Sequence, residues 1–531
     1  MRSPAALALL VLTASTPAGL LAQEYTWQRV AKAEPDECYN GFGQPYLDIS
    51  QCDGTGVPKR NQTYPWGMAL AGHRIWIGTG ANVTHVARGA VGQGSPLDTP
   101  DTVAEYGASQ YPGVPEELKP LLGDWRPPQV WVYDIFRDEQ INVTPDDPLL
   151  GFTLGLRSAG ANNGAVILAG PTLLGLGINL FAFDAHSLRY LGSTTMWQYS
   201  NIRKWVVVDS VMYTGVQDTF SGGGSVLRWR GNRWFPFLFD VVGTLDNDVA
   251  NLAYHDGRLY AGTWAATSLS SLASLVEFIS GSGEPAAIWM SPPIRRFGLS
   301  WIDAGGWTKV WSVTDYEPDP VIAGAYGIGE MASFDGHLYW GTMNPPFSGF
   351  GALAIAYGAP QDPIAAQMFS NRAVSVFRAH RLGHLFLPPQ IELLYGESEF
   401  PVYTPATEQG DESWDFIDNR MGGVAPLYGA SGFDNPNNYY FWSMGVFGGA
   451  LFVGLNEFVQ GGTTGADLWV FPDSGSPAML VDGAGLTTPL NEGFRHMITT
   501  PNALYIGATN GANLSPEGGW ELIRLEGAAG P

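Results

Sequence analysis

A hairpin of apolar strands recurs along the chain. Each copy has an apolar strand, a short turn rich in Gly, Asp or Asn, and a second strand of the form aliphatic-aromatic-x-Gly-Thr. Copies lie at 71–80 (AGHRIWIGTG), 208–217, 255–264, 334–343, 447–456 and 500–509, with a weaker copy at 163–172. Short apolar runs joined by such turns are typical of antiparallel hairpins, so the repeat predicts an all-β protein.

A third strand follows most of these hairpins, as in VWVYDI at 130–135, LFAFDA at 180–185 and WELIRLE at 520–526. Segments such as 233–242 supply a fourth strand. The repeat therefore predicts a β-propeller with seven blades of four antiparallel strands, and leaves six or eight blades open. Gly- and Pro-rich stretches at 85–128, 266–310 and 381–436 are interpreted as surface insertions.

The composition agrees with many short strands and tight turns, since the chain has 68 Gly and 38 Pro and only 15% charged residues. Its formal net charge of −23 argues against a nucleic-acid-binding protein, because phosphate binding needs clustered Lys and Arg.

The N-terminal segment indicates export. Residues 1–22 have the charged, apolar and small-residue regions of a signal peptide, and no later stretch is apolar enough to span a membrane. We expect a secreted protein, extracellular or periplasmic, that is not integral to a membrane. Cys38 and Cys52 are the two cysteines, and an oxidising compartment favours a disulfide between them. The predicted organisation is a signal peptide at 1–22, a disulfide-bearing segment at 23–60 and the propeller at 61–527.

The Gly-Thr hairpins and the closing GGWELIRL at 518–525 resemble secreted kelch-like β-propellers, most closely a functionally uncharacterised bacterial group. The resemblance covers residues 60–527. It implies the propeller architecture and says almost nothing about chemistry.

Candidate site residues follow from propeller geometry. Residues before each first strand and just after each second strand meet at one mouth of the central channel. Counting back twelve residues from the glycines of the hairpins gives Trp66, Arg203, Ala250, Gly329, Trp442 and Arg495, with Arg157 one step out of register and Asn251 and Glu330 adjacent. The second strands are followed by Asn82, Asp218, Trp264, Asn344, Asn456, Glu457 and Asn510.

The leading hypothesis is a non-catalytic binding module at this mouth. Arg157, Arg203 and Arg495 would bind a carboxylate, sulfate or phosphate, and Trp66, Trp264 and Trp442 would stack on sugar or aromatic rings. Asn82, Asn344 and Asn510 are the expected amide contacts. The ligand would be a small polar or anionic molecule, a glycan or a protein.

Two alternatives remain open. The first is an extracellular hydrolase or lyase using Glu330, Glu457 or His496 as acid or base, although no linear catalytic motif is present. Calcium is the one cofactor considered, with Asp218, Asn251 and Glu330 as its oxygen ligands. The second alternative is a structural subunit of a surface assembly.

Overall fold

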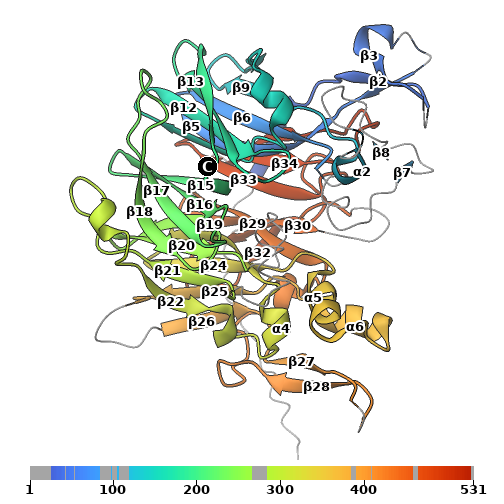
Figure 1. The fold of residues 1–531 in the computed structure, drawn as a ribbon, viewed down its shortest axis with the longest axis vertical. Helices are drawn as coiled ribbons and strands as arrows, with labels where there is room; N and C mark the ends of the chain where they lie inside the picture. Colours follow the sequence, from blue (N-terminus) through green and yellow to red (C-terminus); the bar gives the residue numbers. More distant parts are fainter. Residues whose placement is uncertain are drawn as a thin grey trace, which may run out of the picture.

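The computed structural model describes residues 25–41, 44–52, 54, 56–83, 97–98, 104–106, 116, 119–265, 284–383, 390–407, 410–457 and 464–527 (Figure 1). The signal peptide expected at 1–22 lies outside the described residues, as does most of the insertion expected at 85–128.

All the repeated hairpins form antiparallel strand pairs. The structure is mainly β, and the prediction of an all-β protein is correct except for short helices such as those at Ser348–Tyr357 and Pro363–Ser370. The pairs are β5 (Gln62–Ala71) with β6 (Arg74–Ala81), β11 (Ser158–Asn162) with β12 (Ala165–Pro171), β15 (Tyr199–Val208) with β16 (Val211–Asp218), β19 (Val249–His255) with β20 (Arg258–Thr263), β23 (Gly327–Phe334) with β24 (His337–Met343), β29 (Asn438–Phe447) with β30 (Ala450–Glu457), and β33 (Gly493–Thr499) with β34 (Leu504–Thr509).

Two further strands extend each hairpin into a four-stranded antiparallel unit. In chain order they are β9 (Val130–Asp134) and β10 (Glu139–Asn142), β13 (Ile178–Asp184) and β14 (Tyr190–Met196), β17 (Gly224–Trp229) and β18 (Phe239–Leu245), β21 (Ala287–Met290) and β22 (Thr308–Ser312), β25 (Val376–His380) and β26 (Gln390–Tyr395), β31 (Leu468–Phe471) and β32 (Met479–Asp482), and β35 (Glu521–Gly527) with β1 (Tyr25–Lys32). The first four units are separate sheets, and single bridges join the other three into one 12-stranded sheet.

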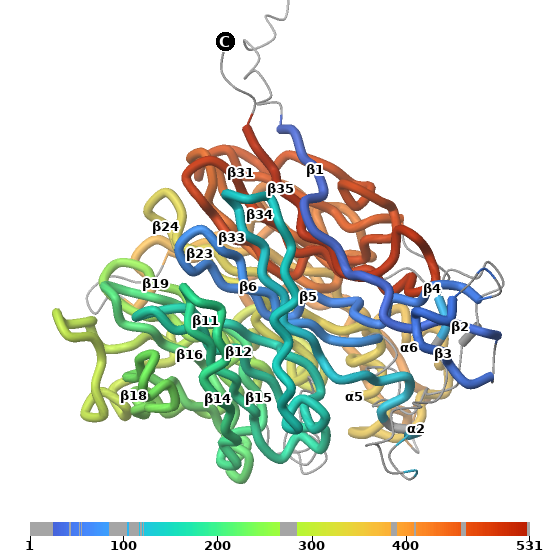
Figure 2. Tube along the Cα trace, turned by 90° about the horizontal axis from the view of Figure 1, so that it is seen from above, coloured from blue at the N-terminus to red at the C-terminus, as the bar shows by residue number. Residues whose placement is uncertain are grey.

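The last unit takes its outer strand from the beginning of the chain. β1 pairs antiparallel with β35, from Tyr25 opposite Gly527 to Lys32 opposite Glu521, and the two strands run side by side in Figure 2. The sequence analysis did not identify this strand, because it lacks the Gly-Thr signature of the hairpins. Two of the expected insertions contain strands of the four-stranded units, since 266–310 contains β21 and 381–436 contains β26.

Glycines in the second strands allow neighbouring units to approach closely. A β-carbon on Gly262 would lie 2.7 Å from Ile328 Cγ2 of the next unit, and one on Gly454 would lie 2.7 Å from Phe494 Cβ. Along the chain, the first strand of each unit contacts the first strand of the next, and β33 also contacts β5. The arrangement of the described strands is therefore propeller-like.

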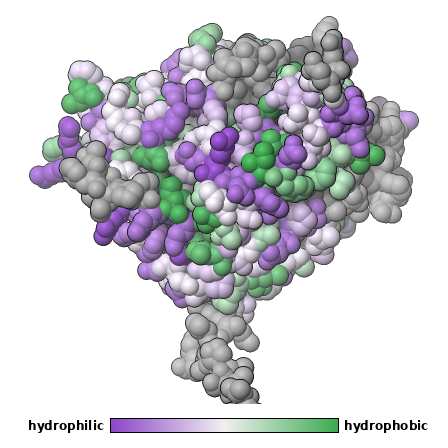
Figure 3. Space-filling view, turned by 90° about the horizontal axis from the view of Figure 1, so that it is seen from below, coloured by the Kyte–Doolittle hydropathy of each residue, from purple (hydrophilic) through white to green (hydrophobic). Residues whose placement is uncertain are grey.

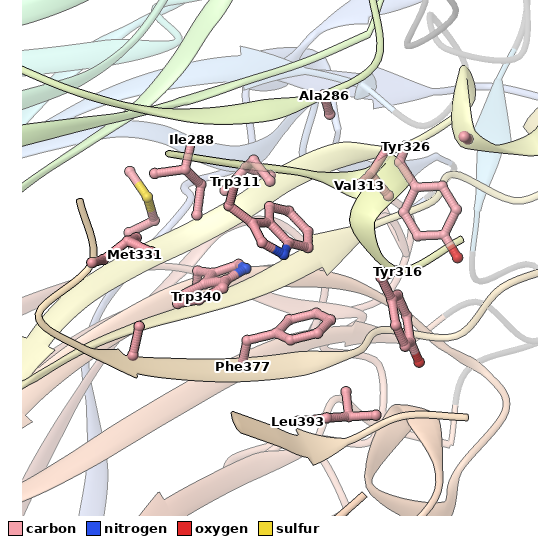
Figure 4. Close-up of a cluster of buried hydrophobic side chains, with 14 of the residues drawn as sticks. Ala286, Ile288, Trp311, Val313, Tyr316, Tyr326, Met331, Trp340, Phe377 and Leu393 are labelled. Carbon is pink, nitrogen blue, oxygen red and sulfur yellow. The ribbon is translucent and has the colours of Figure 1, made fainter. Parts of the chain in front are cut away.

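Large aromatic side chains fill the space between units. Between the fourth and fifth units, Trp340 stacks on Phe377 at a centroid distance of 5.4 Å, and Trp311 meets Trp340 edge-on at 5.5 Å (Figure 4). Both Trp340 and Phe377 have no exposed surface. Buried aromatic pairs of this kind contribute much of the stability of a β-sheet core.

Smaller elements decorate the units. A sheet of β2 (Glu37–Tyr39), β3 (Leu47–Asp48) and β4 (Val57–Lys59) holds the disulfide between Cys38 and Cys52, which confirms that prediction. The others are β7 (Leu97–Asp98) with β8 (Glu105–Tyr106), β27 (Glu399–Thr404) with β28 (Ser413–Asp418), and the helices α2 (Lys119–Leu122), α4 (Pro320–Ala323), α5 (Ser348–Tyr357) and α6 (Pro363–Ser370).

The surface is mostly hydrophilic on the face shown in Figure 3, with small hydrophobic groups between polar ones. Among the helices of the described ranges, none has the length and apolar character needed to cross a membrane.

Candidate functional site

A β-bulge recurs in the first strands, opposite the hairpin glycines. In β5, Pro65 pairs with Thr79 and Gly67 with Gly78, so Trp66 is an additional residue. The same position holds Ala250 in β19, Trp442 in β29 and Arg495 in β33, and the pairs Arg203–Lys204 in β15 and Gly329–Glu330 in β23. A bulge redirects the side chain of its additional residue, so one local irregularity presents a set of side chains from several units.

The sequence pattern predicted that these residues would come before the first strands. The structure instead places them within the first strands. Trp66, for example, is an inner residue of β5, which begins at Gln62. The first strands extend on both sides of the bulge, so these side chains lie between paired stretches of strand. Arg157 differs, because it directly precedes β11 in a unit without this bulge.

The three arginines and three tryptophans selected from the sequence come together. Arg203 Cζ lies 4.0 Å from the ring centroid of Trp264, and Arg157 Cζ lies 5.2 Å from the same ring. Arg157 is also 5.6 Å from Trp66, and Arg495 is 5.5 Å from Trp442. We call this set, Arg157, Arg203, Arg495, Trp66, Trp264 and Trp442, the arginine layer.

Two tyrosines complete the layer, and the sequence analysis missed both. Tyr440 lies 5.1 Å from Trp442 and 6.4 Å from Trp264 by ring centroids. Tyr64 lies 5.9 Å from Trp442 and 6.3 Å from Trp66. A signal was present, because the first and sixth units share the pattern Tyr-x-Trp-x-Met, at 64–68 and 440–444.

The arginines are short of hydrogen-bond acceptors. Arg157 Nη1 donates to Asn201 Oδ1 at 2.8 Å, and Arg203 Nη1 donates to Tyr440 Oη at 3.2 Å. Within the described part of the chain, Arg495 has no side-chain hydrogen bond and no ion pair, although it is only 4% exposed. The Nε atoms of all three arginines are buried without a partner. Buried hydrogen-bond donors in proteins normally have an acceptor. A ligand that brings an acceptor to these Nε atoms would therefore stabilise the site.

Burial and mutual repulsion oppose the positive charges. Burial lowers the pKa of Arg495, and the charge of Arg203 lowers it further. Burial, followed by the charge of Arg203, likewise lowers the pKa of Arg157 to about 10. An anion placed among these groups would relieve both effects.

The nearby carboxylates offset only part of this charge. Glu330 Oε2 accepts from Lys204 Nζ at 2.9 Å, and Asp248 Oδ2 accepts from Asn201 Nδ2 at 2.6 Å. The layer and these neighbours hold four cationic and two anionic side chains. A local excess of positive charge in a chain of net charge −23 favours an anionic ligand.

His496 adjoins the layer and favours the neutral form. Its Nε2 lies 2.8 Å from the carbonyl oxygen of Trp66, so Nε2 carries the proton and Nδ1 is an acceptor. Burial lowers the pKa of His496, and the charge of Arg495 lowers it further. Glu457 lies apart from the arginines, because its carboxylate accepts from Thr464 Oγ1 at 2.5 Å and Asn435 Nδ2 at 3.4 Å.

The asparagines divide into two kinds. The Asn82 amide donates to Asn61 Oδ1 at 3.0 Å and to Asp124, and the Asn510 amide donates to Asn491 Oδ1 and Glu517 O, so both hold loops together. Asn344 differs, because its Nδ2 is buried without a partner.

The structure does not bring the three calcium candidates into one ligand set. The Asn251 amide donates to the carbonyl oxygens of Ile328 and Gly329, Asp218 accepts from Ser225 Oγ at 3.2 Å, and Glu330 is paired with Lys204. Among the described residues, no cluster of three or more His, Cys, Asp or Glu side chains could hold a metal ion.

No family model matches the sequence, and no curated protein matches it either. Solved structures with similar arrangements include the polysaccharide lyase Uly1, with a TM-score of 0.41, 8% identity, and coverage of 96% of this chain and 100% of that one. A second is the β-propeller domain of the Trilobed protease from Pyrococcus furiosus, with a TM-score of 0.31, 8% identity, and coverage of 79% and 98%.

A prolyl endopeptidase matches with a TM-score of 0.36 and 11% identity over 89% of this chain, which spans 51% of the endopeptidase. These neighbours are the β-propeller domain of a protease, an endopeptidase and a lyase, and likenesses of this strength transfer no activity.

Proposed function

We propose that the four-stranded units form a closed seven-bladed β-propeller, and that the arginine layer binds an anionic group of a ligand. The supporting observation is Arg495, a guanidinium that is 4% exposed and has no acceptor within the described residues. Two further arginines lie over the adjoining tryptophan rings.

The donors define the chemistry of the ligand. A carboxylate, sulfate or phosphate would accept hydrogen bonds from the unpartnered Nε atoms of Arg157, Arg203 and Arg495. The tryptophan rings are buried and lie against the arginines, so their role is to hold the guanidinium groups in place for that anion. Arg157 and Tyr440 are half-buried, whereas Arg203 and Arg495 are buried, so the ligand would reach the layer at Arg157 and Tyr440. A small carboxylate or an acidic glycan is therefore the favoured ligand.

The test is the thermal response to anions of Arg495→Met. Wild type should melt at a higher temperature in the presence of a bound carboxylate or sulfated sugar, because such ligands bind only the folded state. Arg495→Met should lose this response. The variant alone should be more stable by about 1 to 3 kcal/mol, since it removes a buried donor without an acceptor.

Arg378→Met is the matched control. Arg378 is 8% exposed but is bonded to Glu392 Oε2 at 2.6 Å, away from the layer. It should lose stability and keep the anion response. An unchanged response in Arg495→Met would contradict the proposal.

A second candidate is a hydrolase or lyase that acts on the bound anion. The neutral His496, with Nδ1 free to accept a proton beside Arg495, is the observation that favours it. If the bound anion is a substrate, His496→Gln should abolish product formation. The same variant should keep the rise in melting temperature that the anion causes. A screen of acidic glycans that yields no product with wild type would exclude this candidate for those glycans.

A further inference from the structure

Two loops lie at the end of the third and fourth units where the first and second strands of each unit are joined. They are the β17–β18 connection, 230–238, and the β21–β22 connection, 291–307. The second loop folds over the preceding unit, because Arg228 Nη1 donates to Leu299 O at 2.9 Å and Thr244 N donates to Ala304 O at 3.1 Å. Both loops project beside β18 and β21 at the left of Figure 1.

Large hydrophobic side chains project from both loops. Trp301 is 75% exposed and Phe235 is 67% exposed. The others are Trp234, Leu238, Phe297 and Ile302. Isolated exposed apolar residues are ordinary, but a group of this size on two loops at the same end of neighbouring units marks an interaction surface.

Positive charge accompanies these residues. Segments 228–240 and 292–303 hold Arg228, Arg230, Arg233, Arg295 and Arg296, against Asp240 and Asp303. Arg230 pairs with Asp240 at 3.1 Å and Arg295 with Asp303 at 3.6 Å. Neither Arg233 nor Arg296 has a carboxylate within bonding distance in the described residues, and each lies over a ring, that of Trp234 at 4.9 Å and that of Phe297 at 5.5 Å.

The combination fits an anionic lipid surface. Tryptophan and phenylalanine insert at the level of lipid headgroups, and arginines beside them are attracted to anionic headgroups. The side chains sit on projecting loops, which suits insertion into an interface more than capture of a peptide in a groove. We propose that these loops, named here the basic aromatic loops, dock the protein peripherally on a membrane containing anionic lipid.

The orientation of the docked protein follows from the topology. Trp229, the last residue of β17 before the first loop, pairs with Met212 at the start of β16, whereas Trp264 follows the end of β20. The basic aromatic loops and Trp264 therefore lie at opposite ends of the strands. Docking would leave the Trp264 end facing away from the membrane, and the inference does not depend on the ligand of the arginine layer.

The experiment is co-sedimentation of the purified protein with phosphatidylcholine vesicles, with and without a quarter of phosphatidylglycerol. Wild type should partition at least about tenfold better onto the anionic vesicles. The double variant Trp234→Ala/Trp301→Ala should lose about tenfold of that binding, and Arg233→Gln/Arg296→Gln should lose the preference for phosphatidylglycerol.

The double variant Trp197→Ala/Phe220→Ala is the matched control. These residues are 63% and 89% exposed and lie on connections at the other end of the strands. The control should bind like wild type, and all variants should melt cooperatively because the changed side chains are exposed. Equal binding of wild type to both vesicle types, no binding to either, or an equal loss in the control would overturn the proposal.

Discussion

Gly507 in the last unit faces Met68 in the first, and a β-carbon on Gly507 would lie 2.5 Å from the Met68 sulfur. Glycines at the same hairpin position face the next unit elsewhere, as Gly262 faces Ile328 and Gly341 faces Phe441. The Gly of the Gly-Thr signature therefore sets the separation between units. It is a packing requirement that recurs with the repeat.

Replacing one of these glycines should destabilise the protein. A β-carbon at Gly341 would overlap the ring of Phe441, so Gly341→Ala should lower the free energy of unfolding by about 1 to 3 kcal/mol. Urea denaturation measures the change. Gly351 in α5 has nothing within 4 Å of its β-carbon position, so Gly351→Ala should be neutral or slightly stabilising. Equal stability of the two variants would contradict this role for the hairpin glycine.

Lys59 is a buried ammonium held between two buried carboxylates. Its Nζ lies 2.6 Å from Glu105 Oε2 and 2.5 Å from Asp124 Oδ2. Lys59→Met should cost about 3 to 5 kcal/mol in chemical denaturation, because it leaves the buried carboxylate of Glu105 without a counter-charge and leaves Asp124 paired with Arg126 alone. The matched change Lys119→Met, at a more exposed pair with Glu116, should cost less than about 1 kcal/mol. A small effect of Lys59→Met would show that the cluster is hydrated.

Ionisation of Asp36 should lower the free energy of unfolding as the pH rises. Burial raises its pKa to about 6, although Asn61 donates two hydrogen bonds to it. The folded state then holds the proton more tightly than the unfolded state, so the stabilisation is complete below about pH 4 and is lost as the pH rises through 6. Each whole number of pKa difference corresponds to about 1.4 kcal/mol.

The advantage of Asp36→Asn over wild type should therefore grow by about 2 kcal/mol between pH 4 and 7, a figure reduced because the side chain keeps some exposure. Unfolding at a series of pH values measures it. The exposed Asp411→Asn should give a curve parallel to wild type. Parallel curves for Asp36→Asn as well would refute the raised pKa.

Tyr440 supplies the one protein acceptor of Arg203 among the described contacts. Tyr440→Phe keeps the ring but leaves that guanidinium without an acceptor, and should cost about 1.5 to 3 kcal/mol in the absence of ligand. The hydroxyl of the neighbouring Tyr439 has no hydrogen bond within the described residues, so Tyr439→Phe should change stability by less than about 0.5 kcal/mol. Saturating anion should reduce the deficit of Tyr440→Phe, and differential scanning calorimetry would record this. A deficit unchanged by anion would separate Arg203 from the binding site.

The sequence was sufficient for the repeat and for part of the site. The Gly-Thr pattern identified the hairpins, and counting from the glycine selected Trp66, Arg203, Trp442 and Arg495 because the bulge keeps a constant distance from it. The prediction that these residues precede the first strands was wrong. The distance between a bulge and the hairpin glycine does not indicate how far the strand extends on the other side of the bulge.

Other features depend on contacts between distant segments. Asn82 was a fair ligand candidate by position, but its partners Asn61, Asp124 and Asn513 are brought to it only by the fold. Arg157 joins the layer without sharing the bulge. Such long-range partners cannot be read from local pattern, because hydrogen bonding depends on three-dimensional neighbours.

The pairing of β1 with β35 constrains the order in which the strands can pair during synthesis. A ribosome releases Tyr25–Lys32 long before Glu521–Gly527, so β1 has no partner strand until about 490 further residues have been made. During that interval its edge is open to wrong pairings. The pairing of β1 with β35 is therefore a late step of folding, and a chain that ends before Glu521 cannot form it.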